Sequence, residues 1–189
     1  FDLILEFEML RNLLVLIATC LLVTLTSSAW AQSGVFGSQH HKYRVVTVVE
    51  GLEIPWSMTF LPDGDMLVTE RPGRLRIVRN GTLLPEAVAG VPAVHAEGQG
   101  GLFEVMTHPN FASNHLLYLT YAKPNEGGST TRLIRAQWEN DQLTNVEEIF
   151  EAATQGRGHY GGKLAFNQGG CIFLTVGDRQ APPTGNLEK

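Results

Sequence analysis

Two polar residues, Gln99 and His159, lie in glycine-rich loops of the kind that present a side chain to a ligand. Gln99 stands in the stretch GQGG and His159 in the stretch GHYGG. Glycine has no Cβ, so backbone or ligand can approach such a loop closely. Imidazole side chains titrate near neutral pH and can accept a proton there, which suits a general base. The alternative is structural: a histidine on the surface, and an amide that satisfies its own turn.

Further polar residues follow His159 along the chain. Lys163 could supply positive charge to an anionic ligand, or it could be a solvated strand residue. The stretch Asp178-Arg179-Gln180 ends a strand and could hold a ligand, although Asp178 could equally cap the turn. We therefore expect Gln99, Lys163 and Gln180 to contribute to substrate or cofactor binding around His159.

Other catalytic signatures are absent from the sequence. It contains no Ser-centred nucleophile elbow, no H-E-x-x-H motif, no P-loop and no dinucleotide fingerprint, so hydrolysis through a covalent Ser or Cys has no support. Nor does it show the several carboxylate or Asn ligands that a metal-centred hydrolase would need, and no metal ligand is assigned. The remaining histidines are expected to be structural or on the surface: His40, His41, His95, His108 and His115.

Three segments with a strand–turn–strand pattern position these loops: residues 57–70, 103–122 and 162–178. Each has a short apolar strand, a polar turn and a second strand, with the period-2 alternation typical of strands. Between them, the pairs Asn80-Gly81 and Asn140-Asp141 each separate two further strand candidates, and Asn-Gly is the strongest short hairpin signal. No long segment carries a helical pattern.

Strand-rich repeats of about 40–60 residues, with four strands each, are typical of β-propeller blades. We therefore predict an all-β fold, a partial β-propeller, with a β-sandwich of regular hairpins as the alternative. In a propeller the innermost strands line a central channel, so the loops of Gln99 and His159 would converge at one mouth of it. Since ring closure is what removes exposed edges, we expect a fragment of a longer protein that is inactive by itself.

The N-terminal residues predict export. Arg11 precedes an apolar run at residues 13–25, and Ala29-Trp30-Ala31 forms an A-x-A cleavage site, so residues 9–31 fit a signal peptide. The run is shorter than the roughly 20 apolar residues of a membrane span, and a retained anchor is the alternative. We expect a periplasmic or secreted protein with no stable membrane span. The expected divisions are upstream translated sequence at 1–8, the signal peptide, a lead-in at 32–44 and the partial propeller domain at 45–189.

The composition excludes some partners. The chain carries a net charge of −5 and no basic stripe, which argues against nucleic-acid binding. Cys171 would be the only cysteine left after cleavage at Ala31, so no internal disulfide is expected despite an oxidising compartment.

Several motifs, in order, resemble one family of enzymes. The stretches GLEIPWSMTFLPDGD, GQGGLFEVMTHPNF, GHYGGKLAFNQGG and FLTVGDR are similar to those of the soluble aldose sugar dehydrogenases, PQQ-dependent propellers related to soluble glucose dehydrogenase. The resemblance runs from about Val45 to the C-terminal end. It implies that the chain covers the first two to three blades of a six-bladed β-propeller. It also implies a quinoprotein that oxidises aldose sugars to lactones and passes electrons to an unidentified acceptor.

The resemblance further implies roles for individual residues. His159 matches the family's catalytic histidine, which takes the proton of the anomeric hydroxyl while hydride passes to PQQ. Gln99 matches the glutamine that contacts substrate and cofactor. The family's calcium ligands and its main PQQ-anchoring basic residues would lie beyond Lys189, so calcium is expected but none of its ligands is assigned.

Three positions depart from the family pattern. Tyr160 stands where relatives often have Phe, Lys163 where they have Arg, and Ile54 where many have His. A lysine cannot reproduce a bidentate arginine contact, so the departures bear on cofactor affinity rather than on the reaction class. The alternative function is a non-catalytic propeller of the same lineage, similar to the hedgehog-interacting-type proteins, which would have no need of Gln99 and His159 together.

Overall fold

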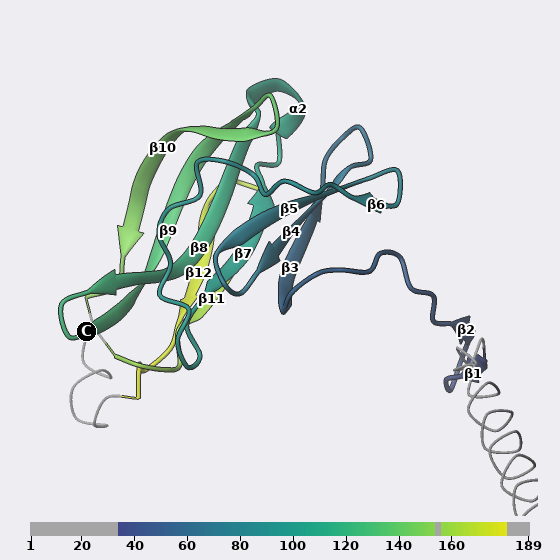
Figure 1. Ribbon diagram of the computed structural model, residues 1–189, viewed down its shortest axis with the longest axis horizontal. Coiled ribbons are helices and arrows are strands. Elements are labelled where there is room, and N and C mark those ends of the chain that lie inside the picture. Colours follow the sequence, from purple (N-terminus) through teal and green to yellow (C-terminus); the bar gives the residue numbers. More distant parts are fainter. Residues whose placement is uncertain (1–33, 154–155, 181–189) are drawn as a thin grey trace, which may run out of the picture. The chain divides into compact units, whose positions relative to one another are not determined.

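The computed structural model describes residues 34–153 and 156–180 (Figure 1). The predicted signal peptide, the residues before it and the residues after Gln180 lie outside the described residues. The chain divides into two compact units between Thr47 and Val48, and each is described by itself. In the first, strands β1 (Val35–Gly37) and β2 (Lys42–Arg44) form an antiparallel hairpin, in which the ring of Phe36 stacks on that of Tyr43.

The second unit begins with a four-stranded antiparallel sheet in the order β3-β4-β5-β6. Its strands are β3 (Pro55–Phe60), β4 (Met66–Glu70), β5 (Arg74–Arg79) and β6 (Thr82–Leu83). The turn between β5 and β6 is the predicted Asn80-Gly81 pair, and both residues have the positive φ that a tight hairpin turn requires.

A second four-stranded antiparallel sheet follows, in the order β7-β8-β9-β10. Its strands are β7 (Leu102–Thr107), β8 (Leu116–Asn125), β9 (Gly128–Glu139) and β10 (Gln142–Glu151). The predicted turn at Asn140-Asp141 joins β9 to β10 with positive φ at both residues. A single helical turn, α2 (Phe111–Asn114), connects β7 to β8 and is too short to give a helical period in the sequence.

The last two strands of the second unit, β11 (Gly161–Phe166) and β12 (Ile172–Val176), form a third sheet, an antiparallel hairpin. The first strand of the middle sheet, β7, contacts both β3 and β11, so the first strands of the three sheets are neighbours (Figure 1). This is the arrangement of innermost propeller strands, with two complete blades and the first hairpin of a third. The prediction of an all-β, partial propeller is therefore confirmed, and the sandwich alternative is wrong.

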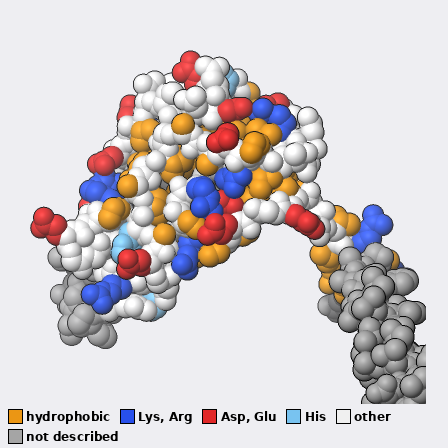
Figure 2. Space-filling view, viewed as in Figure 1, with side chains coloured by type: hydrophobic (Ala, Val, Ile, Leu, Met, Phe, Trp, Pro, Cys, Tyr) orange, Lys and Arg blue, Asp and Glu red, His pale blue; other side chains and the backbone are white. Residues whose placement is uncertain are grey.

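The main core lies between the first two blades. Leucine side chains from both sheets are fully buried there, and Ile134 and Phe111 pack against them. The leucines are Leu67, Leu75, Leu102, Leu117 and Leu119. The other face of β3 is uncovered, because Trp56, Met58 and Phe60 are exposed and line an open apolar groove of about 460 Å³. Figure 2 shows apolar side chains at the surface of the described residues. No helix within residues 34–153 and 156–180 is long and apolar enough to cross a membrane.

Candidate active site

The two glycine-lined loops meet. Gln99 lies in the loop that enters β7, and His159 lies in the loop that enters β11. The backbone N–H of His159 donates a hydrogen bond to Gln99 Oε1, with 2.8 Å between the two atoms. The structure thus brings together the two residues that the sequence singled out, through adjacent innermost strands.

A carboxylate holds the His159 ring. His159 Nδ1 lies 2.6 Å from Asp178 Oδ1, and both side chains are more than half exposed. Asp178 reaches this place because β12 runs back along β11, with Val176 paired to Gly161, so that the end of β12 returns to the loop of His159. Sequence reasoning considered Asp178 only as a turn cap or a ligand-holding residue and missed its bond to the histidine.

The Asp178 carboxylate remains ionised near neutral pH. The backbone N–H of Gln180 donates to its Oδ1 at 3.0 Å, and this bond, followed by the bond to His159, lowers the pKa of Asp178 below its ordinary value. An ionised carboxylate can only accept, so His159 must donate through Nδ1. The lone pair of a neutral imidazole is then on Nε2, which is the nitrogen left for proton transfer.

Gln180 lies beside that nitrogen. Its side-chain Nε2 is 3.4 Å from His159 Nε2, which is at the long end for a hydrogen bond. Gln180 therefore contacts the predicted base directly, and an incoming hydroxyl would replace a weak contact.

Lys163 bonds elsewhere. Its Nζ lies 2.9 Å from Glu104 Oε1, which also accepts a hydrogen bond from Ser57 Oγ at 2.9 Å. These three residues occupy the third positions of β11, β7 and β3, so they form a polar row across three innermost strands. The Glu104 side chain is only 7% exposed whereas that of Lys163 is 69% exposed. The charge of Lys163 is therefore partly neutralised by the buried Glu104 carboxylate.

The two other departures from the family pattern also have local explanations. The extra hydroxyl of Tyr160 lies 2.5 Å from Ser129 Oγ, so it is satisfied in a buried place. Ile54 is exposed at the start of β3 and has a φ of 49°. Tyr160 thus packs in the interior next to the loop of His159. Ile54 has an exposed apolar side chain immediately before β3, the innermost strand of the first blade.

The described residues contain no group of three or more His, Cys, Asp or Glu side chains that could hold a metal ion. Among the other histidines, which are expected to be structural or on the surface, His108 bonds the backbone of a turn. Its Nδ1 accepts a hydrogen bond from the N–H of Asn110 at 2.9 Å.

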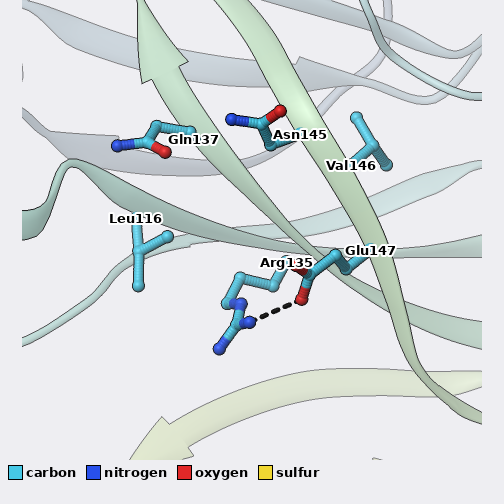
Figure 3. Close-up of a pocket in the computed structure, with 6 residues that line it drawn as sticks. All are labelled: Leu116, Arg135, Gln137, Asn145, Val146 and Glu147. Atoms are coloured by element: carbon cyan, nitrogen blue, oxygen red, sulfur yellow. Dashed lines mark hydrogen bonds and ion pairs between the residues drawn. The ribbon is translucent and has the colours of Figure 1, made fainter.

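A separate hollow of about 520 Å³ lies on the second blade, lined by Leu116, Arg135, Gln137, Asn145, Val146 and Glu147 (Figure 3). The strand β10 has a register shift there, and Asn145 has a φ of 47°. Arg135 and Glu147 form an ion pair at 2.5 Å beside the hollow. None of the residues predicted to bind substrate or cofactor lines it.

Most of the chain matches known proteins in sequence. The family model described as Glucose / Sorbosone dehydrogenase matches residues 52–187. An uncharacterized protein of Synechocystis is 43% identical over 150 residues, which are 74% of this chain and 36% of that protein. The aldose sugar dehydrogenase YliI of Escherichia coli is 31% identical over 175 residues, which are 89% of this chain and 45% of that protein. The chain thus spans less than half the length of these relatives.

The backbone also superposes on a solved structure of a similar protein. The PQQ-bound form of an aldose sugar dehydrogenase from Streptomyces coelicolor is 27% identical and superposes with a TM-score of 0.64. The superposition covers 72% of this chain and 42% of that one. Both the sequence and the backbone therefore correspond to one part of a longer relative.

Proposed function

The chain belongs to the Glucose / Sorbosone dehydrogenase family, and we propose that the protein that carries it oxidises aldose sugars at the anomeric carbon to lactones, with PQQ as the hydride acceptor. The observation that carries the proposal is an exposed imidazole held through Nδ1 by the Asp178 carboxylate and through its backbone by Gln99. A propeller that only binds a partner has no need of an ionised carboxylate behind an exposed histidine. The names of the E. coli and Streptomyces relatives support the substrate class and the cofactor.

His159 would act as the general base. With Nδ1–H donated to Asp178, the lone pair of Nε2 accepts the proton of the anomeric hydroxyl as the hydride leaves the same carbon. Asp178 then stabilises the imidazolium that forms, as the carboxylate does in other carboxylate–histidine pairs. A positioned base of this kind contributes roughly 10²- to 10⁴-fold to the rate.

Gln99 would orient both the base and the ligand. Its Oε1 accepts from the backbone of His159, which leaves the amide NH₂ end as a donor to a sugar hydroxyl or a quinone carbonyl. This donor and the imidazole fit the carbonyl end of PQQ. The anionic end of that cofactor needs cations, and Lys163 provides only a charge shared with Glu104. When bound, PQQ supplies the carbonyl carbon that accepts the hydride.

We further propose that the protein is exported and that calcium accompanies PQQ, with ligands beyond Lys189. The support for export is sequence alone: the apolar run at 13–25 and the A-x-A site ending at Ala31.

The direct experiment uses the full-length protein, prepared without cofactor and then loaded with PQQ and calcium. We expect aldose-dependent reduction of an artificial dye only after loading. Dye reduction without PQQ, or none across a panel of aldoses with PQQ bound, would contradict the proposal, and the second result would favour the binding module.

A further inference from the structure

A buried arginine lies between the two residues that touch the base. Arg179 follows Asp178 and precedes Gln180, both of which contact the His159 ring, yet its own side chain is almost completely buried at 1% exposure. Arg179 and Gln180 have φ values of 62° and 53°. With this turn of the backbone the Arg179 side chain lies inside the protein, while the side chains of its two neighbours contact the His159 ring.

The Arg179 guanidinium holds the loop on both sides of His159. Before the histidine, Nη1 donates to Gly158 O at 2.9 Å and Nη2 donates to Gly156 O at 3.2 Å. After the histidine, the guanidinium carbon lies 3.6 Å from the centre of the Tyr160 ring, a cation–π contact. One planar side chain thus contacts the His159 loop at three residues, through two hydrogen bonds and one ring contact.

The same guanidinium ties the loop to the second blade. Nη2 also donates to the carbonyl of Ser129 on β9 at 3.0 Å, and Ser129 Oγ bonds Tyr160 Oη. The backbone of Gly156 bonds Ser129 as well, through its N–H at 3.1 Å. Arg179 is therefore the point at which the loop of His159, the end of β12 and strand β9 meet.

The loop needs such support because of its own sequence. His159 has a φ of 46°, in the left-handed region that non-glycine residues rarely adopt. Its glycine neighbours allow many other backbone conformations. A Cβ on Gly177 would lie 2.0 Å from His159 O, so the loop is packed closely against the strand end that carries Asp178. Contacts from outside the loop must therefore select this conformation. The Arg179 guanidinium provides them, and the same hydrogen bonds offset the cost of burying its charge.

We propose that Arg179 is a positioning residue for His159. Its guanidinium fixes residues 156–160 so that His159 Nδ1 stays on Asp178 and Nε2 stays directed to the substrate. The proposal rests on the proposed function for the role of His159, but the position of the ring can be measured without turnover.

The test compares Arg179→Lys with Arg132→Lys in the full-length protein. Lysine keeps the charge but lacks the planar fork whose two nitrogens donate to Gly158 and Ser129 and whose plane stacks on Tyr160. Arg132 is a matched control because it is also buried, lies on β9 and pairs with Glu148 and Glu151 of β10 rather than with residues 156–160. The first readout is the ¹⁵N NMR spectrum of the histidines without cofactor, with the His159 signals assigned by their loss in His159→Gln.

The expected wild-type result is a single His159 tautomer with Nδ1 protonated. Arg179→Lys should give mixed tautomers or broadened His159 signals, and in the PQQ-loaded protein kcat should fall at least tenfold while KM for the sugar changes less than about threefold. Arg132→Lys should leave the tautomer and kcat as in wild type. An Arg179→Lys protein with the wild-type tautomer and kcat but a lower melting temperature would overturn the proposal, since it would assign Arg179 to stability alone.

A measurement on the wild type decides the case if Arg179→Lys does not fold. The backbone N–H of His159 should exchange with deuterium as slowly as the N–H groups within β11. Exchange of that N–H as fast as at the exposed tip Gly127 would mean that the loop is not held, and would also overturn the proposal. If dye reduction fails altogether but the tautomer responds as expected, the proposed function falls while the positioning by Arg179 stands.

Discussion

Replacing Asp178 by Asn isolates the charge behind the base. The substitution keeps the shape of the side chain and removes the anion that fixes Nδ1–H of His159, 2.6 Å away. In a buried carboxylate–histidine pair the corresponding change lowers kcat by about 10⁴-fold. Here the histidine and the carboxylate are 52% and 59% exposed, so water screens the charge and stabilises the imidazolium in part. We therefore expect kcat to fall by about 10- to 100-fold.

The pKa of Asp178 sets the pH range of this deficit. The backbone N–H of Gln180 and the His159 ring lower that pKa below its ordinary value of 3.8. A group with a lowered folded-state pKa contributes above its unfolded-state pKa and loses the contribution as the pH falls through the folded value. Asp178 should hence be ionised throughout the assay range, and the deficit of Asp178→Asn should be present at every pH from about 6 upward.

The assay is steady-state dye reduction by the PQQ-loaded full-length protein between pH 6 and 9, with the melting temperature as a check on folding. Glu147→Gln is the matched control, because Glu147 is also 59% exposed and pairs with Arg135 at 2.5 Å beside the hollow of the second blade, which His159 does not line (Figure 3). Its kcat should stay within twofold of wild type. An Asp178→Asn variant that retains more than half of the wild-type kcat would show that the base does not depend on this carboxylate. An equal loss in Glu147→Gln would show that the effect is not specific to Asp178.

Two substitutions test the other polar contacts. Lys163→Met should lower the free energy of unfolding by about 1 kcal/mol, because it leaves the buried Glu104 without its cation, and Glu104→Gln in the same chain should recover most of the loss. Thermal melts measure this, and a single variant as stable as wild type would contradict the pairing. Tyr160→Phe should lower the same free energy by about 0.5–1.5 kcal/mol through loss of the Ser129 hydrogen bond, with kcat within twofold of wild type. A large loss of kcat would show that this hydrogen bond also helps to position the loop of His159.

Much of the fold could be predicted because it depends on local signals. Alternating apolar residues and the turn pairs Asn80-Gly81 and Asn140-Asp141 indicated the strands that the structure contains. The glycine-lined loops indicated Gln99 and His159, since both lead into the first strand of a repeat and such strands are neighbours in a propeller. The helical turn α2 was not predictable from a period that needs several turns to be seen.

The contacts that complete the site could not be predicted in the same way. The bond from Asp178 to His159 depends on the register of β11 with β12, which shifts between Gly161 and Leu164. The pairing of Lys163 with Glu104 requires the third positions of neighbouring innermost strands to be level. Arg179 reads as a surface residue from its type, and only the left-handed turn at its backbone explains its burial.

Single-turnover reduction of bound PQQ shows whether His159 is the base. Wild-type and His159→Gln proteins, loaded with PQQ and calcium and kept free of oxidant, are mixed with excess aldose while the cofactor absorbance is followed. We expect both proteins to bind PQQ with similar affinity and reduction to be roughly 10²- to 10⁴-fold slower in the variant. Reduction at a near wild-type rate in His159→Gln would mean that His159 is not the base.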